Sequence, residues 1–307
     1  MGAHILVFPF PAQGHILPLL DLTHQLALRG LTITVLVTPK NLSFVQPLLA
    51  RHSTSIKTLV LPFPTATGSS TSSLPPGIEN MKDLPSSYMP AMLHAMSKLH
   101  EPLLQWFESQ IQYSSSPPVA IVSDLFLGWT QSLAVRLNIV RIIFYCKDPN
   151  HRFSASGVPT SPVFPIYQIY ILHHLYADDS PIWEVLQHNS SLNRASWGIV
   201  LNSFTELEGP FLNYLRKNYG NHGRVWGVGP LLPPIDHLQK DSSAAARDRG
   251  GPTSIRIEQN RQSVVYVCFG SQIVLNRKQI EALSIGLELS KVKFIWCVKE
   301  TSILPVQ

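Results

Sequence analysis

The stretch HILVFPFPAQGHILPLLDL, residues 4–22, decides the fold. Its first five residues form a continuous apolar run, which predicts a short buried strand. From Ile16 to Leu28 apolar residues recur at nearly helical spacing, and Gly30 suits the position just after a helix end. A buried strand that leads through a glycine-containing turn into a helix is typical of the first unit of a parallel α/β sheet.

The same alternation of strands and helices continues along the chain. Further strands are predicted at residues 32–38, 56–61, 119–123, 141–145, 197–202 and 225–228, and further helices at 88–112, 125–137 and 205–218. Apolar strands separated by helices imply a sheet covered on both faces, so we predict an α/β fold with a Rossmann-like, doubly wound parallel sheet.

A second unit of the same kind is predicted near the end of the sequence. Residues 264–269, 277–289 and 293–298 give one strand, one helix and one more strand. The segment 236–262 is polar and rich in small residues, which is typical of a linker. We therefore expect a first domain at residues 1–235, a linker at 236–262 and an incomplete second Rossmann-like domain at 263–307.

The composition excludes several classes of protein. Hydrophobic residues make up 45% and charged residues 14% of the sequence, which supports a substantial core and excludes global disorder. The net charge is +5, but the basic residues are scattered without runs, so no nucleic-acid partner is expected. The apolar N-terminus has no basic region and is interrupted by prolines and a glycine, so neither a signal peptide nor stable membrane insertion is expected.

The three cysteines, Cys146, Cys268 and Cys297, are odd in number and far apart. The last two lie within apolar runs that resemble strands. We therefore expect buried free thiols in a reducing compartment, which predicts a cytoplasmic protein.

The order of the strands predicts where chemistry takes place. In a doubly wound sheet, ligands bind beyond the carboxyl ends of the strands, where the strand order reverses. His15 follows the first strand and Asp124 ends the fourth, and these two strands normally flank that point. A carboxylate that holds an imidazole fixes its tautomer and lets it act as a general base. The alternatives are a capping or packing role for His15 and a helix N-cap role for Asp124.

Two further observations concern a phosphate and a metal. The Gly270-Ser271 step ends a strand before a helix, where backbone N–H groups and a hydroxyl suit a phosphate, although a plain turn is the alternative. The sequence contains no Asp-x-Asp pair and no Cys/His spacing that fits zinc, so no metal is expected.

Several stretches together carry a resemblance to a known family. They are FPFPAQGHILPLLDL (8–22), VSDLFLGWTQSLA (122–134), WGIVLNSFTELEG (197–209), RVWGVGPLLPP (224–234), SVVYVCFGSQ (263–272) and KFIWCVKE (293–300). The chain resembles the plant UDP-dependent glycosyltransferases of family 1, most of all the branch that glucosylates flavonoids and small phenolic acids. This resemblance implies the GT-B arrangement of an acceptor-binding N-terminal domain and a C-terminal domain that binds the UDP-sugar.

The resemblance also implies roles for individual residues. His15 would be the catalytic base and Asp124 its partner, Gly14 and His15 would contact the acceptor, and Ser271 with Gly270 would help bind the UDP diphosphate. The reaction would be an inverting hexosyl transfer, with glucose as the expected sugar, from a UDP-sugar to a hydroxyl of a phenolic or flavonoid acceptor. No cofactor is expected, because the UDP-sugar is a co-substrate.

The sequence departs from the family pattern in three places. Family members continue beyond Gln307 into a box with W-A-P-Q and H-C-G-W-N-S that holds the nucleotide sugar. FYCKDPNHRF (144–153) and RIEQNRQ (256–262) replace a small-residue turn and a short helix. We therefore expect a chain truncated before the donor-binding box, a glycosyltransferase by descent that is inactive or strongly impaired as written.

Two other hypotheses remain. One is a non-enzymatic module that binds the acceptor or a partner, which differs from the enzyme in not binding UDP-glucose. The other is an unrelated Rossmann-type nucleotide-binding protein, which is disfavoured because no G-x-G-x-x-G follows the first strand.

Overall fold

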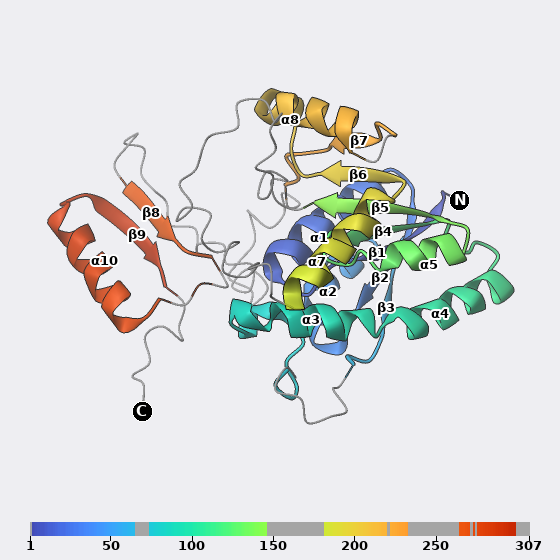
Figure 1. The fold of residues 1–307 in the computed structure, drawn as a ribbon, viewed down its shortest axis with the longest axis horizontal. Helices are drawn as coiled ribbons and strands as arrows, with labels where there is room; N and C mark the ends of the chain where they lie inside the picture. The colour runs from blue at the N-terminus through green and yellow to red at the C-terminus, as the bar shows by residue number, and fades with distance from the viewer. Residues whose placement is uncertain are drawn as a thin grey trace.

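The computed structural model describes residues 2–64, 74–145, 181–219, 222–232, 264–270, 273 and 275–298. Within these ranges the chain forms a seven-stranded sheet of order β3-β2-β1-β4-β5-β6-β7 and a separate two-stranded sheet (Figure 1). The seven strands are β1 (His4–Phe8), β2 (Thr32–Val37), β3 (Ile56–Val60), β4 (Ala120–Asp124), β5 (Val140–Tyr145), β6 (Gly198–Leu201) and β7 (Val225–Gly227). Every neighbouring pair is parallel, which confirms the predicted doubly wound α/β fold.

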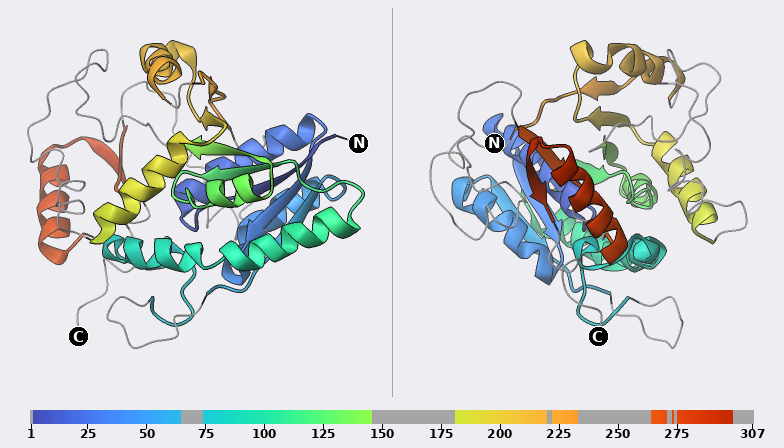
Figure 2. Two further views of the ribbon diagram at one scale, coloured as in Figure 1. Left: turned by 45° about the vertical axis from the view of Figure 1, so that its right-hand side comes forward. Right: turned by 90° about the vertical axis from the view of Figure 1, so that its left-hand side faces the viewer.

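Helices cover both faces of the large sheet (Figure 2). They are α1 (Gln13–Leu28), α2 (Leu42–Arg51), α3 (Met89–Ser97), α4 (His100–Tyr113), α5 (Thr130–Arg136), α7 (Pro181–Arg194) and α8 (Thr205–Asn218), with short 3-10 helices at Pro39–Asn41, Met81–Asp83 and Ser86–Tyr88. The helices α1 and α2 pack on one face, and α3, α4 and α5 pack on the other. None of the helices in the described ranges has the length and apolar character that crossing a bilayer requires.

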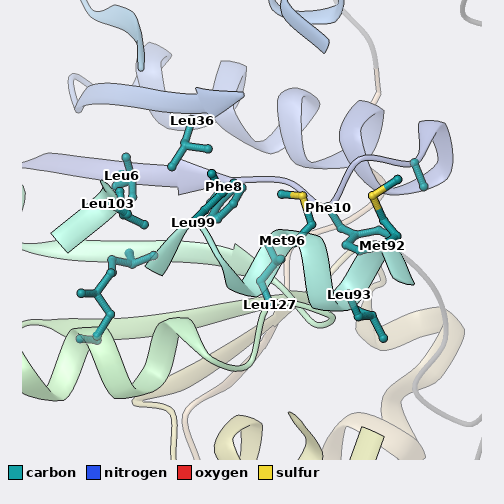
Figure 3. Packing of buried hydrophobic residues seen from close by; sticks show 14 of the residues in the cluster. Leu6, Phe8, Phe10, Leu36, Met92, Leu93, Met96, Leu99, Leu103 and Leu127 are labelled. Atoms are coloured by element: carbon teal, nitrogen blue, oxygen red, sulfur yellow. The ribbon is translucent and has the colours of Figure 1, made fainter. Parts of the chain in front are cut away.

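The central strand β1 contributes to two cores, one on each face of the sheet. Leu6 and Phe8 lie in the core formed with α3 and α4, where Figure 3 shows them beside Met96, Leu99 and Leu103. Ile5 and Val7 lie in the core formed with α1 and α2. Because successive strand residues point to opposite faces, a strand covered on both sides is apolar at most of its positions. This explains the continuous apolar run that opens the sequence.

Two predicted helices differ from the observed ones. The stretch predicted as one helix at 88–112 is divided into α3 and α4, because Lys98 and Leu99 make tighter i→i−3 bonds and Pro102 has no N–H for the next bond. The helix predicted at 125–137 begins only at Thr130, because the residues before it form a turn. The sequence analysis did not assign α2 and α7.

The second unit consists of β8 (Val264–Cys268), α10 (Arg277–Leu289) and β9 (Lys293–Cys297), and its two strands are parallel. Asn276 and Gln279 form a reciprocal capping box at the start of α10. None of the described residues between 264 and 298 is buried. The expectation of buried thiols is therefore wrong for Cys268 and Cys297, which are free and exposed. Cys146 and the predicted linker at 236–262 lie outside the described residues.

Candidate active site

The carboxyl ends of β1 and β4 bring His15 and Asp124 together. The two strands are neighbours, with Phe8 opposite Ser123. His15 lies in the first turn of α1, which follows β1, and Asp124 is the last residue of β4. The His15 Nδ1 atom lies 2.7 Å from Asp124 Oδ2, and the side chains are 12% and 0% exposed. The predicted proximity of this dyad is thus confirmed.

The carboxylate of Asp124 is held at both oxygens. Its Oδ2 atom faces His15, and its Oδ1 atom accepts a hydrogen bond of 2.9 Å from the backbone N–H of Phe126. This second bond closes a turn within residues 124–127. The alternative of Asp124 as the N-cap of a helix at 125–137 is therefore wrong, because the helix begins six residues later, at Thr130.

The pairing through Nδ1 determines what the imidazole can do. A neutral histidine that donates its Nδ1 proton to a carboxylate carries its lone pair on Nε2. The remaining nitrogen is then the one that can accept a proton, and the carboxylate stabilises the imidazolium that results. The geometry therefore suits general-base chemistry at Nε2.

The start of α1 places His15 at the positive end of a helix. The N-cap is Ala12, whose carbonyl accepts the N–H groups of His15 and Ile16, and the first turn contains no acidic residue. The preceding carbonyl, Pro11, accepts the N–H of Met81 at 2.8 Å, which anchors the loop before the helix. The helix dipole at this end favours the neutral imidazole, which is the form that a base needs.

Two aromatic rings enclose the imidazole. The ring of Phe126 lies 5.1 Å from that of His15 at an interplanar angle of 31°, and Phe10 lies 5.7 Å away on edge. The rings of Phe10 and Phe126 are themselves 5.1 Å apart. The sequence analysis missed both phenylalanines, although both stand within the motifs that it quoted. They give the dyad an apolar, aromatic surrounding.

Helix α7 holds the turn that follows Asp124. The carbonyl of Leu125 accepts hydrogen bonds from the side-chain amides of Asn189, at 2.6 Å, and Asn193, at 2.9 Å. The Oδ1 atom of Asn189 also accepts the N–H of Gly128 at 2.5 Å. The asparagines of α7, a helix that the sequence analysis did not assign, therefore position the residues beside the dyad.

The structure describes two of the three other predicted site residues, Gly14 and Gly270. Gly14 lies in the first turn of α1, directly before His15, and is exposed. Gly270 has a φ of 76° just after β8, in the separate two-stranded unit, and Ser271 lies outside the described residues. The predicted phosphate contacts of Gly270 and Ser271 stay predictions. Within the described ranges, no three His, Cys, Asp or Glu side chains come together in an arrangement that could hold a metal ion.

Comparisons with known proteins point to one family. A family model described as the N-terminal domain of glycosyltransferases matches residues 3–233. The chain is 45% identical to an Arabidopsis thaliana protein named flavonol 3-O-glucosyltransferase UGT89B1, over 97% of this chain and 64% of that protein. It is 44% identical to UDP-glycosyltransferase 89B2 of Stevia rebaudiana, over 98% of this chain and 66% of that protein. The chain thus spans about two thirds of the length of these relatives.

A solved structure agrees with this likeness. The crystal structure of Arabidopsis thaliana UGT89C1 complexed with UDP-L-rhamnose superposes with a TM-score of 0.75 at 36% sequence identity. The match covers 98% of this chain and 65% of that one.

Proposed function

This chain belongs to the glycosyltransferases, as the match of residues 3–233 to their N-terminal domain shows, and its relatives are plant UDP-glycosyltransferases. We therefore propose that it supplies the acceptor-binding and base-bearing half of a flavonol glucosyltransferase. The donor is a UDP-sugar, and the acceptor is a hydroxyl of a flavonol or a related phenol. The observation that carries the proposal is the partly buried contact of 2.7 Å between His15 Nδ1 and Asp124 Oδ2 at the carboxyl edge of the sheet.

The proposed mechanism starts from the neutral imidazole. His15 Nε2 takes the proton of the acceptor hydroxyl while the oxygen attacks the anomeric carbon of the sugar, and the UDP diphosphate leaves from the opposite side with inversion. Asp124 orients the ring through Nδ1 and stabilises the imidazolium. A phenolic hydroxyl suits this base, because its ordinary pKa of about 10 is much lower than that of an alcohol.

The proposed acceptor class follows from the aromatic surrounding of the base. Phe10 and Phe126 flank His15, and aromatic rings pair favourably with flat aromatic ligands. The relative at 45% identity is named a flavonol 3-O-glucosyltransferase, which supports a flavonol. Glucose is the proposed sugar because that relative is more similar to this chain than the 36%-identical protein crystallised with UDP-L-rhamnose.

We propose that the 307-residue polypeptide, assayed alone, binds the acceptor but transfers sugar poorly. No described residue of the β8–α10–β9 unit is buried, so the described part of this unit offers no enclosed surface for a nucleotide sugar. Holding both reactants in place contributes a large part of an enzymatic rate, about 10⁵ M or more in effective molarity. His15 and Asp124 therefore need a complete donor site opposite them.

The test compares two proteins. One is the 307-residue chain, and the other joins residues 1–298 to the corresponding C-terminal remainder of the Arabidopsis flavonol 3-O-glucosyltransferase. We expect both to bind kaempferol or quercetin, measured by quenching of tryptophan fluorescence. Only the chimera should form a glucoside from UDP-glucose, measured by chromatography with mass detection. UDP-rhamnose should be a poor donor for the chimera.

Substitutions in the chimera assign the chemistry. His15→Ala should lower transfer by about 10²–10⁴-fold, the usual contribution of a general base, and Asp124→Asn should lower it strongly. His94→Ala, which changes an exposed histidine on α3, is the matched control and should leave transfer unchanged. If the folded chimera with His15→Ala transfers sugar as well as the unmodified chimera, His15 is not the general base. Acceptor binding with no transfer by any form would favour a non-enzymatic binding module.

A further inference from the structure

A charged residue lies inside one of the most apolar strands of the sheet. Arg141 is the second residue of β5, in the run VRIIFY, and it is 1% exposed. It is the largest of the fully buried side chains in the described residues. Burying a guanidinium is costly unless it is both hydrogen-bonded and compensated by a negative charge. Its presence at this position therefore requires an explanation.

The guanidinium is hydrogen-bonded on all three nitrogens. Its Nε atom donates to Ser123 Oγ at 2.8 Å, and its Nη1 atom donates to Asn193 Oδ1 and Ser196 Oγ, both at 2.8 Å. Its Nη2 atom donates to the backbone carbonyl of Asp124 at 3.2 Å. All four acceptors are neutral, so these bonds satisfy the donors but do not balance the charge.

The dyad contains a carboxylate that acts electrostatically on Arg141. Burial lowers the pKa of Arg141 to about 10, which leaves the side chain cationic at neutral pH. Tyr145, Tyr219 and Asp124 all act on it electrostatically, and burial raises the pKa of both tyrosines, so the phenols are neutral. Asp124 is then the anion among these groups. It has no exposed surface, so the two opposite charges share one buried environment.

The strand register explains how Arg141 reaches the dyad. Arg141 lies opposite Ile121 in the β4–β5 ladder, and its side chain extends past Ser123 to the carbonyl of Asp124, at the carboxyl edge. Its bonds to Asn193 and Ser196 connect the same guanidinium to the end of α7 and the residues that precede β6. One side chain thus joins β4, β5 and the helix that holds the turn after Asp124.

We infer that Arg141 is a positioning residue of the dyad, whose buried guanidinium is the counter-charge of the Asp124 carboxylate and ties β4 and β5 to α7. The catalytic consequence rests on the proposed function, whereas the electrostatic arrangement does not. The arrangement is therefore a chain of three buried or partly buried groups, in which His15 contacts the carboxylate of Asp124 and Arg141 bonds the backbone carbonyl of the same residue.

The test follows the protonation of His15 in the ligand-free 307-residue chain. Ring-labelled histidine reports this by nuclear magnetic resonance, and the His15 signal is identified by its loss in His15→Gln. We expect Arg141→Met to raise the midpoint pH of the His15 titration by about one unit, because loss of a nearby cation favours the imidazolium. That is about a tenfold gain in proton affinity. Arg141→Lys keeps the charge and should stay close to the wild type.

A matched control separates electrostatics from packing. Ile143→Ala truncates a fully buried side chain two residues along the same strand and removes no charge. It should leave the titration of His15 unchanged although it weakens the core. A folded Arg141→Met whose titration equals that of Ile143→Ala would overturn the inference. These measurements need neither donor nor acceptor, so their outcome is independent of whether the chain transfers sugar.

A second variant keeps the inference testable if Arg141→Met does not fold. The double variant Arg141→Met/Asp124→Asn removes both buried charges, so we expect it to recover soluble, folded protein. If Arg141 contributed only hydrogen bonds and packing, Asp124→Asn would lower the stability of the Arg141→Met variant further. A double variant that is no more stable than Arg141→Met would therefore overturn the inference.

Discussion

The carboxylate of Asp124 depends on a short turn for its orientation. Residues 124–127 close on the Asp124 side chain through the N–H of Phe126, and α7 holds the following residues through Asn189. Gly128 allows this close approach, because an added Cβ atom would lie 2.7 Å from the backbone oxygen of Asn189. The position therefore needs glycine for space rather than for an unusual backbone angle.

Substitution of Gly128 tests this contact. We expect Gly128→Ala to lower the free energy of unfolding by about 1–3 kcal/mol, the usual cost of overpacking, as measured by urea denaturation. Gly209→Ala in α8 is the matched control, since its Cβ would lie 3.4 Å from Thr205 Cγ2, an ordinary contact. Equal losses in the two variants would show that α7 does not constrain the turn.

The contact between α1 and α2 contains a pair of histidines. His24 lies in α1 and His52 caps the end of α2, and His24 Nδ1 lies 2.6 Å from His52 Nε2. One ring must donate and the other accept, so this hydrogen bond is lost when both rings are protonated. Burial, followed by repulsion from the other histidine and from Arg51, lowers the pKa of His24, and burial with repulsion from Arg51 lowers the pKa of His52.

These shifts predict how stability depends on pH. Both pKa values are lower in the folded chain than the ordinary 6.5, so below that pH the unfolded chain binds more protons. The contribution of the pair to the free energy of unfolding is complete above about pH 6.5 and is lost as the pH falls. The loss is up to about 1.4 kcal/mol per pH unit for each proton that the unfolded chain binds and the folded chain does not. His52→Gln should reduce this loss between pH 7.5 and 5.5, as measured by urea denaturation.

An exposed histidine provides the comparison for this experiment. His94→Gln on α3 should keep the pH dependence of the unmodified chain, because its side chain lies on the surface and away from α1 and α2. A pH dependence that His52→Gln and His94→Gln leave equally unchanged would assign the effect to other groups, such as the buried His4, whose pKa burial also lowers.

At the scale of the whole molecule, the described residues form two sheets that differ in how far other elements cover them. The seven-stranded sheet has a core on each face, whereas the two-stranded unit has no buried residue among those described. Exposed apolar side chains such as Val265, Phe269 and Phe294 lie on this unit. Local stability follows burial, so the two parts are expected to open with very different free energies.

Hydrogen exchange measures this difference. We expect backbone amides of β8, α10 and β9 to exchange faster than those of β1 and β4 by on the order of a hundredfold or more, because local unfolding of an uncovered unit costs little. Equal protection of both parts in a monomer would contradict this expectation. Association through the exposed strands could also protect the unit, and size-exclusion chromatography would then show a larger species.

The sequence was sufficient for the features that depend on local pattern and strand order. Apolar runs predicted the strands, and helical spacing predicted α8 and α10 with the bounds that the structure has. The proximity of His15 and Asp124 was also predictable, because the carboxyl ends of adjacent parallel strands lie side by side at the same edge of the sheet. Arg141, a charge within an apolar strand, was a visible signal that the prediction did not use.

Other features arise from contacts between segments that are distant in the sequence. The bond between Gly128 and Asn189 joins residues 61 positions apart, and that between Arg141 and Asn193 joins residues 52 apart. The late start of α5 and the position of α7 depend on such bonds. The exposure of Cys268 and Cys297 depends likewise on what packs over their strands, which no local pattern specifies. Local periodicity defines which face of an element is apolar, but burial and charge compensation exist only once the elements have packed together.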